Sequence, residues 1–142
     1  MYKLFGTLNI PGDKSVSHRA LILSSMSIGK SEITNLLEAD DIKATIQILK
    51  LLGITIHKKL GKWIVYGNGT NGFLQPKKDL NALNSGTTAR TMIGAVSSNP
   101  IECRFIGDRS LSKRSTGVEK TLSAALERRS ARGFCGSRIG FH

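Results

Sequence analysis

The feature that most constrains the fold is a strongly amphipathic stretch in the first third of the chain. Apolar residues recur every three or four positions from Ile42 to Leu52, which is the spacing of one helical face. Asp40 and Asp41 stand in front of this stretch, where carboxylates are favoured by the positive end of a helix dipole. Gly53 follows directly and is typical of a helix end. The pattern therefore predicts a helix over residues 40–52.

Strand and helix signals alternate around this helix in a mixed order. Residues 54–56 and 63–66 are short apolar runs on either side of the turn 59–61, which is typical of a hairpin. Ser15 and Ser17 are the expected N-caps of an earlier helix. The other expected elements are the end of that helix at Met26, strands at 7–10, 31–37 and 102–106, a helix over 84–98, and a turn-rich loop at 67–79. This order predicts an α/β protein of the α+β type, without continuous parallel winding.

Composition excludes several classes of protein. The chain has 142 residues, of which 39% are hydrophobic, so we expect one ordinary domain with a packed core. No apolar run approaches the roughly 20 residues of a membrane helix, and the N-terminus lacks the apolar stretch of a signal peptide. The two cysteines form neither a disulfide framework nor a zinc pattern. We therefore expect a cytoplasmic protein with no metal.

The net charge of +11 does not by itself identify a partner. Nucleic acids, acidic membranes and small phosphorylated metabolites are all compatible with it. Aromatic residues make up only 6% of the chain, and most lysines occur singly or in pairs, so a base-stacking surface is not indicated. A solvated basic surface is the simplest interpretation unless the chain also holds a site of phosphate size.

The most informative stretch is Pro11-Gly12-Asp13-Lys14-Ser15-Val16-Ser17-His18-Arg19. It presents Lys14 at a strand-to-helix turn and two hydroxyl groups in the first helical turn. Ser15 and Arg19 are four residues apart and share a helix face, so both side chains can converge on one anion. The same pattern also describes a capped helix start with exposed basic residues, and this stretch alone does not decide between the two interpretations.

Two further segments have similar chemistry. In Leu83-Asn84-Ser85-Gly86-Thr87-Thr88-Ala89-Arg90, Gly86 lets a ligand approach the backbone, and Asn84 offers an amide donor and acceptor. Taken alone, this segment is an N-capped helix start. Residues 107–114 follow a strand and end in two cations, which is also the pattern of a basic loop. Three anion-competent turns at strand–helix junctions nevertheless favour a shared anion site, because backbone N–H groups at helix starts bind anions.

Taken in order, the three segments resemble the EPSP synthases, the 3-phosphoshikimate 1-carboxyvinyltransferases. The family signature Pro-Gly-(Asp/Ser)-Lys-Ser-x-Ser-(His/Asn)-Arg is intact at 11–19, Asn-(Ser/Ala)-Gly-Thr-x-x-Arg at 84–90, and Gly-Asp-x-Ser-Leu-x-Lys-Arg at 107–114. The resemblance covers residues 3–114. It implies the enolpyruvyl transferase fold of two lobes, each made of three βαβαββ units. This chain would contain one complete unit and the start of a second.

The resemblance also implies a reaction and the residues that serve it. The family transfers the enolpyruvyl group of phosphoenolpyruvate to the 5-hydroxyl of shikimate 3-phosphate and releases phosphate, in the shikimate pathway of aromatic amino acid biosynthesis. No metal or organic cofactor is needed, and glyphosate is the inhibitor. The residues that match shikimate 3-phosphate ligands are Lys14, Ser15 and Arg19. The residues that match phosphoenolpyruvate ligands are Lys14, Asn84, Gly86 and Arg114.

The resemblance ends at Arg114, so we expect a family region at 1–114 and a basic tail at 115–142. A capping-box pattern predicts a short helix over 117–129, and residues 130–142 have no periodicity and are expected to be disordered. The family's second half supplies the acid–base carboxylates. We therefore expect a truncated member with no catalytic residue and no turnover alone. Its stability should be marginal, because a single unit buries little apolar surface.

Two other functions stay open. A UDP-N-acetylglucosamine enolpyruvyl transferase shares the fold but usually has Lys-Asn at Lys14-Ser15, so Ser15 favours shikimate 3-phosphate. A small basic nucleic-acid-binding module would use the net charge and the Arg-rich tail, but it leaves the three matched segments unexplained. Among single side chains, we expect His18 on a helix surface, with a polar role at the edge of the site as the alternative. We expect His57 to be solvated on its hairpin and Cys103 to be partly buried in a strand.

Overall fold

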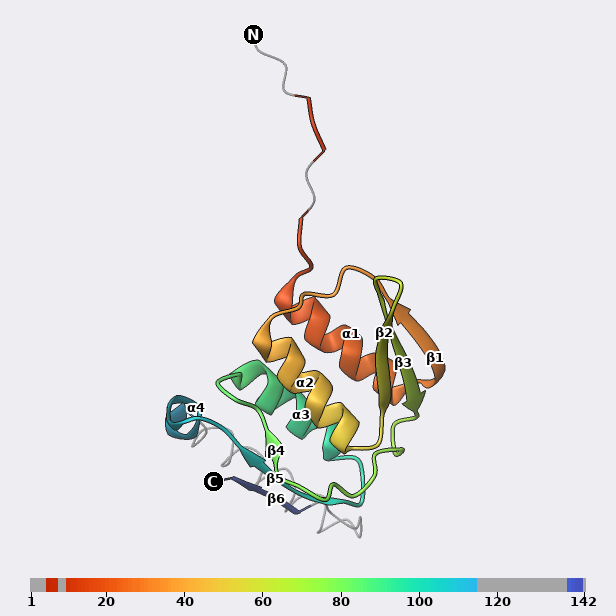
Figure 1. The fold of residues 1–142 in the computed structure, drawn as a ribbon. Helices are drawn as coiled ribbons and strands as arrows, with labels where there is room; N and C mark the ends of the chain where they lie inside the picture. The colour runs from red at the N-terminus through yellow and green to blue at the C-terminus, as the bar shows by residue number, and fades with distance from the viewer. Residues whose placement is uncertain (1–4, 8–9, 115–137, 142) are drawn as a thin grey trace.

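The computed structural model describes residues 5–7, 10–114 and 138–141, and its elements follow the mixed order expected from the sequence (Figure 1). Helices alternate with strands, which confirms the α/β class. The elements are α1 (Lys14–Met26), β1 (Ile28–Ile33), α2 (Asp40–Leu51), β2 (Thr55–Lys59), β3 (Lys62–Asn68), β4 (Leu80–Asn81), α3 (Gly86–Val96), β5 (Glu102–Ile106), α4 (Arg109–Arg114) and β6 (Arg138–Phe141).

Helices α1, α2 and α3 lie side by side between two small sheets (Figure 1). Strands β1, β3 and β2 pair antiparallel in that order, and strands β4, β5 and β6 pair parallel in that order. Helix α1 packs on the first sheet, and α2 contacts both β2 and β4. The three helices run in the same direction, so their N-terminal ends lie at one edge of the molecule.

The core lies where the helices meet each other and the sheets. The apolar face predicted for α2 is buried, because Ile42, Ile46, Leu49 and Leu52 are at most 4% exposed. Met92 of α3 and Phe105 of β5 are also almost fully buried. The periodicity therefore identified both the helix and the side that faces the core. At about 25 cal/mol for each Å² of apolar surface removed from water, these contacts are the main stabilising term.

The hairpin is formed as predicted. Lys59 of β2 pairs with Lys62 of β3, which leaves a two-residue loop between the strands. Both loop residues have positive φ angles, 50° at Leu60 and 76° at Gly61. Such a loop twists in the same sense as the strands it joins, and it is the favoured way to close a tight hairpin.

Two predicted strands differ from the structure. The strand expected at 31–37 is β1 at Ile28–Ile33, because Asn35 turns the chain into the left-handed region with a φ of 53°. Leu37 then lies against α1, where its N–H donates to Ser17 Oγ at 3.1 Å. In the strand expected at 7–10, the described Thr7 and Ile10 belong to no strand, and residues 8–9 lie outside the described residues.

The C-terminal expectations are also corrected in part. Residues 109–114 form the short helix α4, which agrees with a strand–helix junction and excludes the alternative of a basic loop: Asp108 Oδ1 accepts a hydrogen bond from Leu111 N at 2.7 Å and so caps the helix start. Residues 138–141, expected to be disordered with the rest of 130–142, form strand β6 on the edge of β5. An edge strand has unpaired backbone groups that another strand can satisfy. The helix expected at 117–129 lies outside the described residues.

Cys103 provides a test of how tightly β5 is packed. Its side chain is 7% exposed, deeper than expected, and burial raises the pKa of its thiol to about 11. Because only the thiolate reacts, we predict that iodoacetamide at pH 8 alkylates Cys103 roughly 100-fold more slowly in the folded protein than in urea. Mass spectrometry of the Cys103 peptide measures both rates. Equal rates would show that β5 is not buried as described.

Candidate anion-binding site

Helix α1 begins at the first signature segment, but its cap differs from the prediction. Asp13, and neither Ser15 nor Ser17, is the N-cap: its Oδ1 accepts from Val16 N at 2.7 Å. Asp13 has extended backbone, whereas both serines lie inside the helix. Ser17 Oγ donates to the Asp13 carbonyl oxygen at 2.7 Å and is buried. Asp13 is the N-cap because it is the last non-helical residue before Lys14, the first residue of α1.

The predicted ligands of this segment lie on the outer part of α1. Ser15 and Arg19 are both exposed and are four residues apart on the helix, as the sequence indicated. Lys14 Nζ forms an ion pair with Asp41 in the first turn of α2. This pair joins the openings of two helices. About half of the Lys14 side chain stays exposed.

Helix α3 begins at the second signature segment. Ser85 is its N-cap and accepts from Thr88 N at 3.2 Å, and Gly86 is the first helical residue. Asn84, just before the cap, is exposed. A Cβ atom built on Gly86 would meet only the Leu111 side chain among the described residues, at 3.8 Å. Packing within the described residues therefore does not require glycine at this position.

A buried row of hydroxyl groups connects the openings of α1, α2 and α3. The Thr45 Oγ1 atom lies 2.8 Å from His18 Nδ1 and 3.0 Å from Thr88 Oγ1. Thr88 Oγ1 continues the row to Ser85 Oγ at 2.8 Å. Both threonine hydroxyls also lie near the Asp41 carbonyl oxygen, at 3.3 Å and 3.2 Å. The first two signature segments are therefore joined through side chains of α2.

The buried row was not predicted from the sequence, and the surface position expected for His18 is wrong. His18 is fully buried, not on the helix surface. The pKa of His18 is lowered, mainly by burial. The Asp41 carboxylate acts in the opposite direction and raises this pKa, whereas the Lys14 ammonium group lowers it. One signal was present in the sequence: Thr45 is three residues after Ile42 and shares its core face. His57 is exposed as expected and stacks on Tyr66 with ring centroids 5.9 Å apart.

The third signature segment lies against the second. Asp108 N donates to the Leu83 carbonyl oxygen at 2.9 Å, and Leu111 of α4 is the side chain nearest to Gly86. A Cβ atom on Gly107 would come within 2.5 Å of Leu111, so this close contact requires glycine. Arg114 is the last residue of α4. Figure 1 shows α4 at the same edge of the molecule as the openings of α2 and α3.

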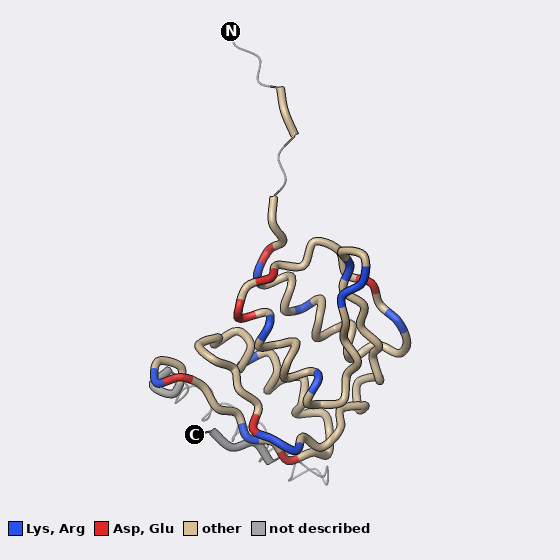
Figure 2. Tube along the Cα trace, in the orientation of Figure 1, with Lys and Arg blue, Asp and Glu red and all other residues tan. Residues whose placement is uncertain are grey.

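The carboxylates at these helix openings already have partners. Asp13 and Asp108 cap helices, and Asp40 and Asp41 pair with Lys43 and Lys14. Figure 2 shows acidic and basic residues together at this edge. Within the described residues, no three His, Cys, Asp or Glu side chains come close enough to hold a metal ion. The edge thus combines three positive helix ends with the cations of Lys14 and Arg19, which suits a small anion.

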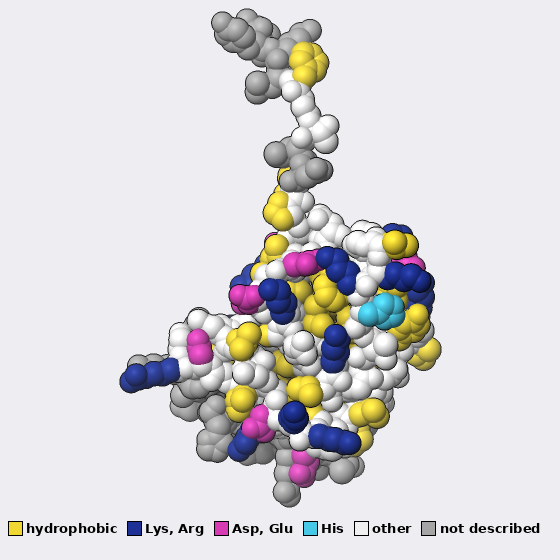
Figure 3. Space-filling model, in the orientation of Figure 1, with side chains coloured by type: hydrophobic (Ala, Val, Ile, Leu, Met, Phe, Trp, Pro, Cys, Tyr) yellow, Lys and Arg dark blue, Asp and Glu magenta, His cyan; other side chains and the backbone are white. Residues whose placement is uncertain are grey.

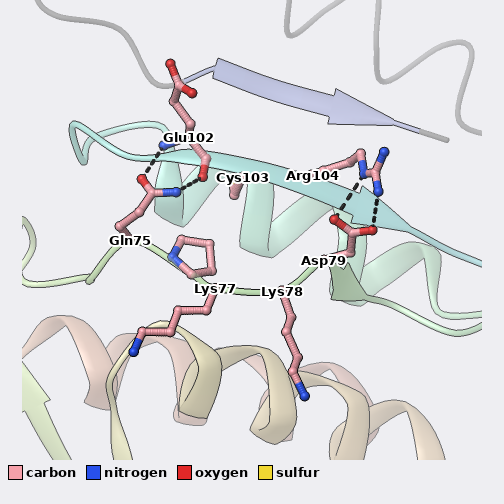
Figure 4. A pocket seen from close by; sticks show the side chains of 8 residues that line it. Gln75, Lys77, Lys78, Asp79, Glu102, Cys103 and Arg104 are labelled. Carbon is pink, nitrogen blue, oxygen red and sulfur yellow. Dashed lines mark hydrogen bonds and ion pairs between the residues drawn. The ribbon is translucent and has the colours of Figure 1, made fainter.

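A separate groove of about 380 Å³ lies between residues 75–79 and β5 (Figure 4). Polar contacts bridge the loop and the strand at both ends of the groove. The Gln75 amide hydrogen-bonds both backbone groups of Glu102, and Arg104 binds the Asp79 carboxylate. None of the predicted ligands lines this groove.

The comparisons with known proteins point to the same family. A family model described as EPSP synthase (3-phosphoshikimate 1-carboxyvinyltransferase) matches residues 1–123, and so continues past Arg114. A 3-phosphoshikimate 1-carboxyvinyltransferase from Zymomonas mobilis is 46% identical over 115 residues, which is 80% of this chain and 25% of the relative. One from Novosphingobium aromaticivorans is 43% identical, with 80% and 26% covered.

Solved structures agree with this match. An EPSP synthase from Acinetobacter baumannii superposes with a TM-score of 0.77 and 36% identity, covering 84% of this chain and 27% of that one. A second structure of the enzyme from that organism gives a TM-score of 0.72 at 37% identity, covering 76% and 25%. The chain spans about a quarter of the length of the curated relatives it matches.

The described elements therefore define part of an enolpyruvyl transferase fold. The order α1–β1–α2–β2–β3 is that of a βαβαββ unit, whose leading strand is not among the described residues, and β4–α3–β5 begins the next unit. With the match over residues 1–123, the chain belongs to the EPSP synthase family. No helix in the described part of the chain has the length and apolar character needed to cross a membrane.

Ser85 tests whether the opening of α3 depends on its cap. Ser85→Ala removes the acceptor for Thr88 N, and we predict a loss of about 1–2 kcal/mol in the free energy of unfolding. Urea denaturation followed by circular dichroism measures it. Thr87→Ala, at an exposed position in the same turn, is the control and should cause no loss. Equal stabilities of the two variants would show that Ser85 does not cap α3.

Proposed function

We propose that the openings of α1 and α3, together with α4, bind the two substrates of the EPSP synthase reaction, shikimate 3-phosphate and phosphoenolpyruvate. One observation carries the proposal: the His18–Thr45–Thr88–Ser85 row holds two separate signature segments together at one edge. The relatives named above are 3-phosphoshikimate 1-carboxyvinyltransferases, which supports this choice of substrates.

Shikimate 3-phosphate binds, on this proposal, at the opening of α1. Ser15 supplies a hydroxyl donor and Arg19 a planar guanidinium, which suits the bidentate binding of phosphate or carboxylate. Lys14 also belongs to this part of the site, and its ammonium group forms an ion pair with Asp41 of α2. The Asp41 carboxylate positions Lys14, and the exposed half of the lysine side chain faces the ligand.

Phosphoenolpyruvate binds beside shikimate 3-phosphate. Its ligands on this proposal are Lys14, Asn84, Gly86 and Arg114. Without a Cβ atom on Gly86, the small ligand can approach the backbone N–H groups at the positive end of α3. Asn84 donates from its side-chain amide just before the cap. Arg114 adds a second cation from α4, which packs near Gly86 through Leu111. Glyphosate, an anionic inhibitor, occupies the same place.

The reaction of the whole protein protonates phosphoenolpyruvate, adds the shikimate 5-hydroxyl and expels phosphate from a tetrahedral intermediate. The described residues bind and orient the two polyanions and stabilise charge on them. We assign no acid–base role to the carboxylates at the helix openings, because each is engaged in a cap or an ion pair. No cofactor takes part, and the reaction takes place in the cytoplasm.

The arrangement of surface charge favours this function over nucleic-acid binding. Several lysines are paired with carboxylates: Lys30 and Lys62 with Glu32, and Lys58 with Glu38. On the face that Figure 3 shows, Lys and Arg side chains are separated by apolar and uncharged surface and do not form one continuous patch. A nucleic-acid site would instead present unpaired cations in a row.

Arg19→Ala tests the shikimate 3-phosphate site. The change removes a charge-assisted hydrogen bond, worth about 1.5–3 kcal/mol, so the Kd for shikimate 3-phosphate should increase at least tenfold. Titration calorimetry of the full chain measures it, with Lys59→Ala on the exposed hairpin as a matched loss of charge that should have no effect. Unchanged affinity in Arg19→Ala would refute the assignment, and binding of UDP-N-acetylglucosamine instead would indicate the sister family.

Gly86→Ala tests the phosphoenolpyruvate site. The added methyl group would lie 3.8 Å from Leu111, an ordinary contact, so the fold should be retained. Placed at the matching glycine of a full-length relative, the change should weaken glyphosate and phosphoenolpyruvate binding by crowding the ligand. Inhibition kinetics with glyphosate would show this as an increased inhibition constant, and circular dichroism would confirm an intact fold. An unaltered inhibition constant would mean that Gly86 does not contact the ligand.

A further inference from the structure

His18 is a buried titratable side chain that the proposed binding site does not use. It is fully buried in α1, four residues after Lys14, and its Nδ1 atom lies 2.8 Å from Thr45 Oγ1. Its Nε2 atom is buried and has no hydrogen-bond partner among the described residues. Buried ring nitrogens usually have a hydrogen-bond partner. Burying an unpaired nitrogen costs free energy of folding, and a leucine at the same place would not have this cost.

Counting protons along the row identifies the tautomer. The carbonyl oxygen of Asp41 can only accept, and the Thr45 hydroxyl lies 3.3 Å from it in the usual geometry of a helical threonine. If Thr45 gives its single proton either to that carbonyl or to Thr88 Oγ1 at 3.0 Å, His18 must donate from Nδ1. If Thr45 donated to Nδ1 instead, the imidazole proton would be on Nε2, which has no acceptor. Buried N–H donors without an acceptor are rarer than unsatisfied acceptors, so the Nδ1–H form is favoured.

The charge state follows from the same contacts. A protonated imidazole would have an N–H at Nε2 with no acceptor and would also place a charge in the core. Burial lowers the pKa of His18, and of the two charged groups that act on it, Asp41 raises it while Lys14 lowers it. Thr45 and Thr88, which extend the row from α2 and α3, do not titrate. His18 is therefore neutral at physiological pH.

We propose that His18 is a positioning residue of the anion site: by donating its Nδ1 proton to Thr45, it fixes the opening of α3 relative to the opening of α1. Thr45 in turn holds Thr88, whose hydroxyl and backbone N–H both reach Ser85 Oγ at the cap. Asn84 and Gly86 lie at that cap, and Lys14 and Ser15 lie one turn before His18. The proposal rests on the proposed function for its ligand, but its geometry can be tested without one.

Substitutions separate this role from simple packing. In His18→Asn, the amide Nδ2–H occupies the place of the imidazole Nδ1–H and can still donate to Thr45. In His18→Gln the amide nitrogen lies one bond further out and misses Thr45, and His18→Leu has no donor. His57→Asn is the matched control, because it makes the same change at an exposed histidine.

Two measurements on the full chain need no ligand. Nitrogen-15 NMR should show the His18 proton on Nδ1 at pH 7, and amide exchange at Thr88 should be slow in the wild type and in His18→Asn but at least tenfold faster in His18→Gln. Stability should also decrease as the pH falls below about 6.5, where the unfolded chain binds a proton that the folded chain excludes. His18→Asn should lack this component. A proton on Nε2, or equal Thr88 exchange in the Asn and Gln variants, would overturn the proposal.

Shikimate 3-phosphate then tests the consequence for binding. By calorimetry, the Kd should stay within about threefold of the wild-type value in His18→Asn and His57→Asn, and should increase at least tenfold in His18→Gln and His18→Leu. Equal affinities in all four variants would show that His18 does not position the site. If the wild type itself fails to bind, the proposed function is wrong and the ligand part of this inference is wrong with it. The tautomer and the Thr88 exchange still decide whether His18 fixes the opening of α3.

Discussion

Hydrogen bonds at the Asp41 carbonyl and the Thr45 hydroxyl link the openings of the three helices through the core. These two groups of α2 lie between His18 of α1 and Thr88 of α3, and they are the polar connection between segments that are far apart in the sequence. A hydrogen bond inside the protein is stronger than one in water, and an unmade one is correspondingly costly. The row therefore favours one relative placement of the three helix openings, which apolar packing alone would define less sharply.

This placement has an electrostatic consequence. Helices that run in the same direction place their positive ends together, and an anion at that edge interacts with all of them. Without an anion, the same edge would be repulsive, because Lys14 and Arg19 add further positive charge. Acidic side chains reduce that cost: Asp13 caps α1, and Asp41 pairs with Lys14. The charge at this edge is thus partly balanced, and half of the Lys14 side chain and the Arg19 side chain stay exposed.

Local patterns predicted the local structure well and the long-range structure poorly. The periodicity of α2 and the hairpin turn at Leu60 and Gly61 needed only neighbouring residues, and both are confirmed. The strand at 31–37 was misplaced because Asn35 adopts a positive φ that its flanking residues do not indicate. Asp13 was not predicted as the N-cap because two serines, which are equally good caps, follow it. Only the position of the first helical residue, Lys14, shows which of the three is the cap.

The candidate site shows the same division. The three segments were recognised from their residue types and their resemblance to a family, whereas their convergence depends on contacts across dozens of residues that no local pattern encodes. His18 was expected at the surface, although it shares a helix face with the buried Leu21, Ile22 and Ser25, so the signal was present and was overlooked. Whether Lys14, Ser15, Arg19, Asn84, Gly86 and Arg114 bind substrate stays a prediction.

The openings of α1 and α3 should act as one anion site. Titrating the nitrogen-15-labelled chain with shikimate 3-phosphate, followed by two-dimensional NMR, tests it most directly. We expect the backbone amide signals of Ser15 and Gly86 to shift together and to give the same Kd, while those of the hairpin at Leu60 stay in place. Signals that shift at only one of the two openings, or with two different Kd values, would contradict a shared site.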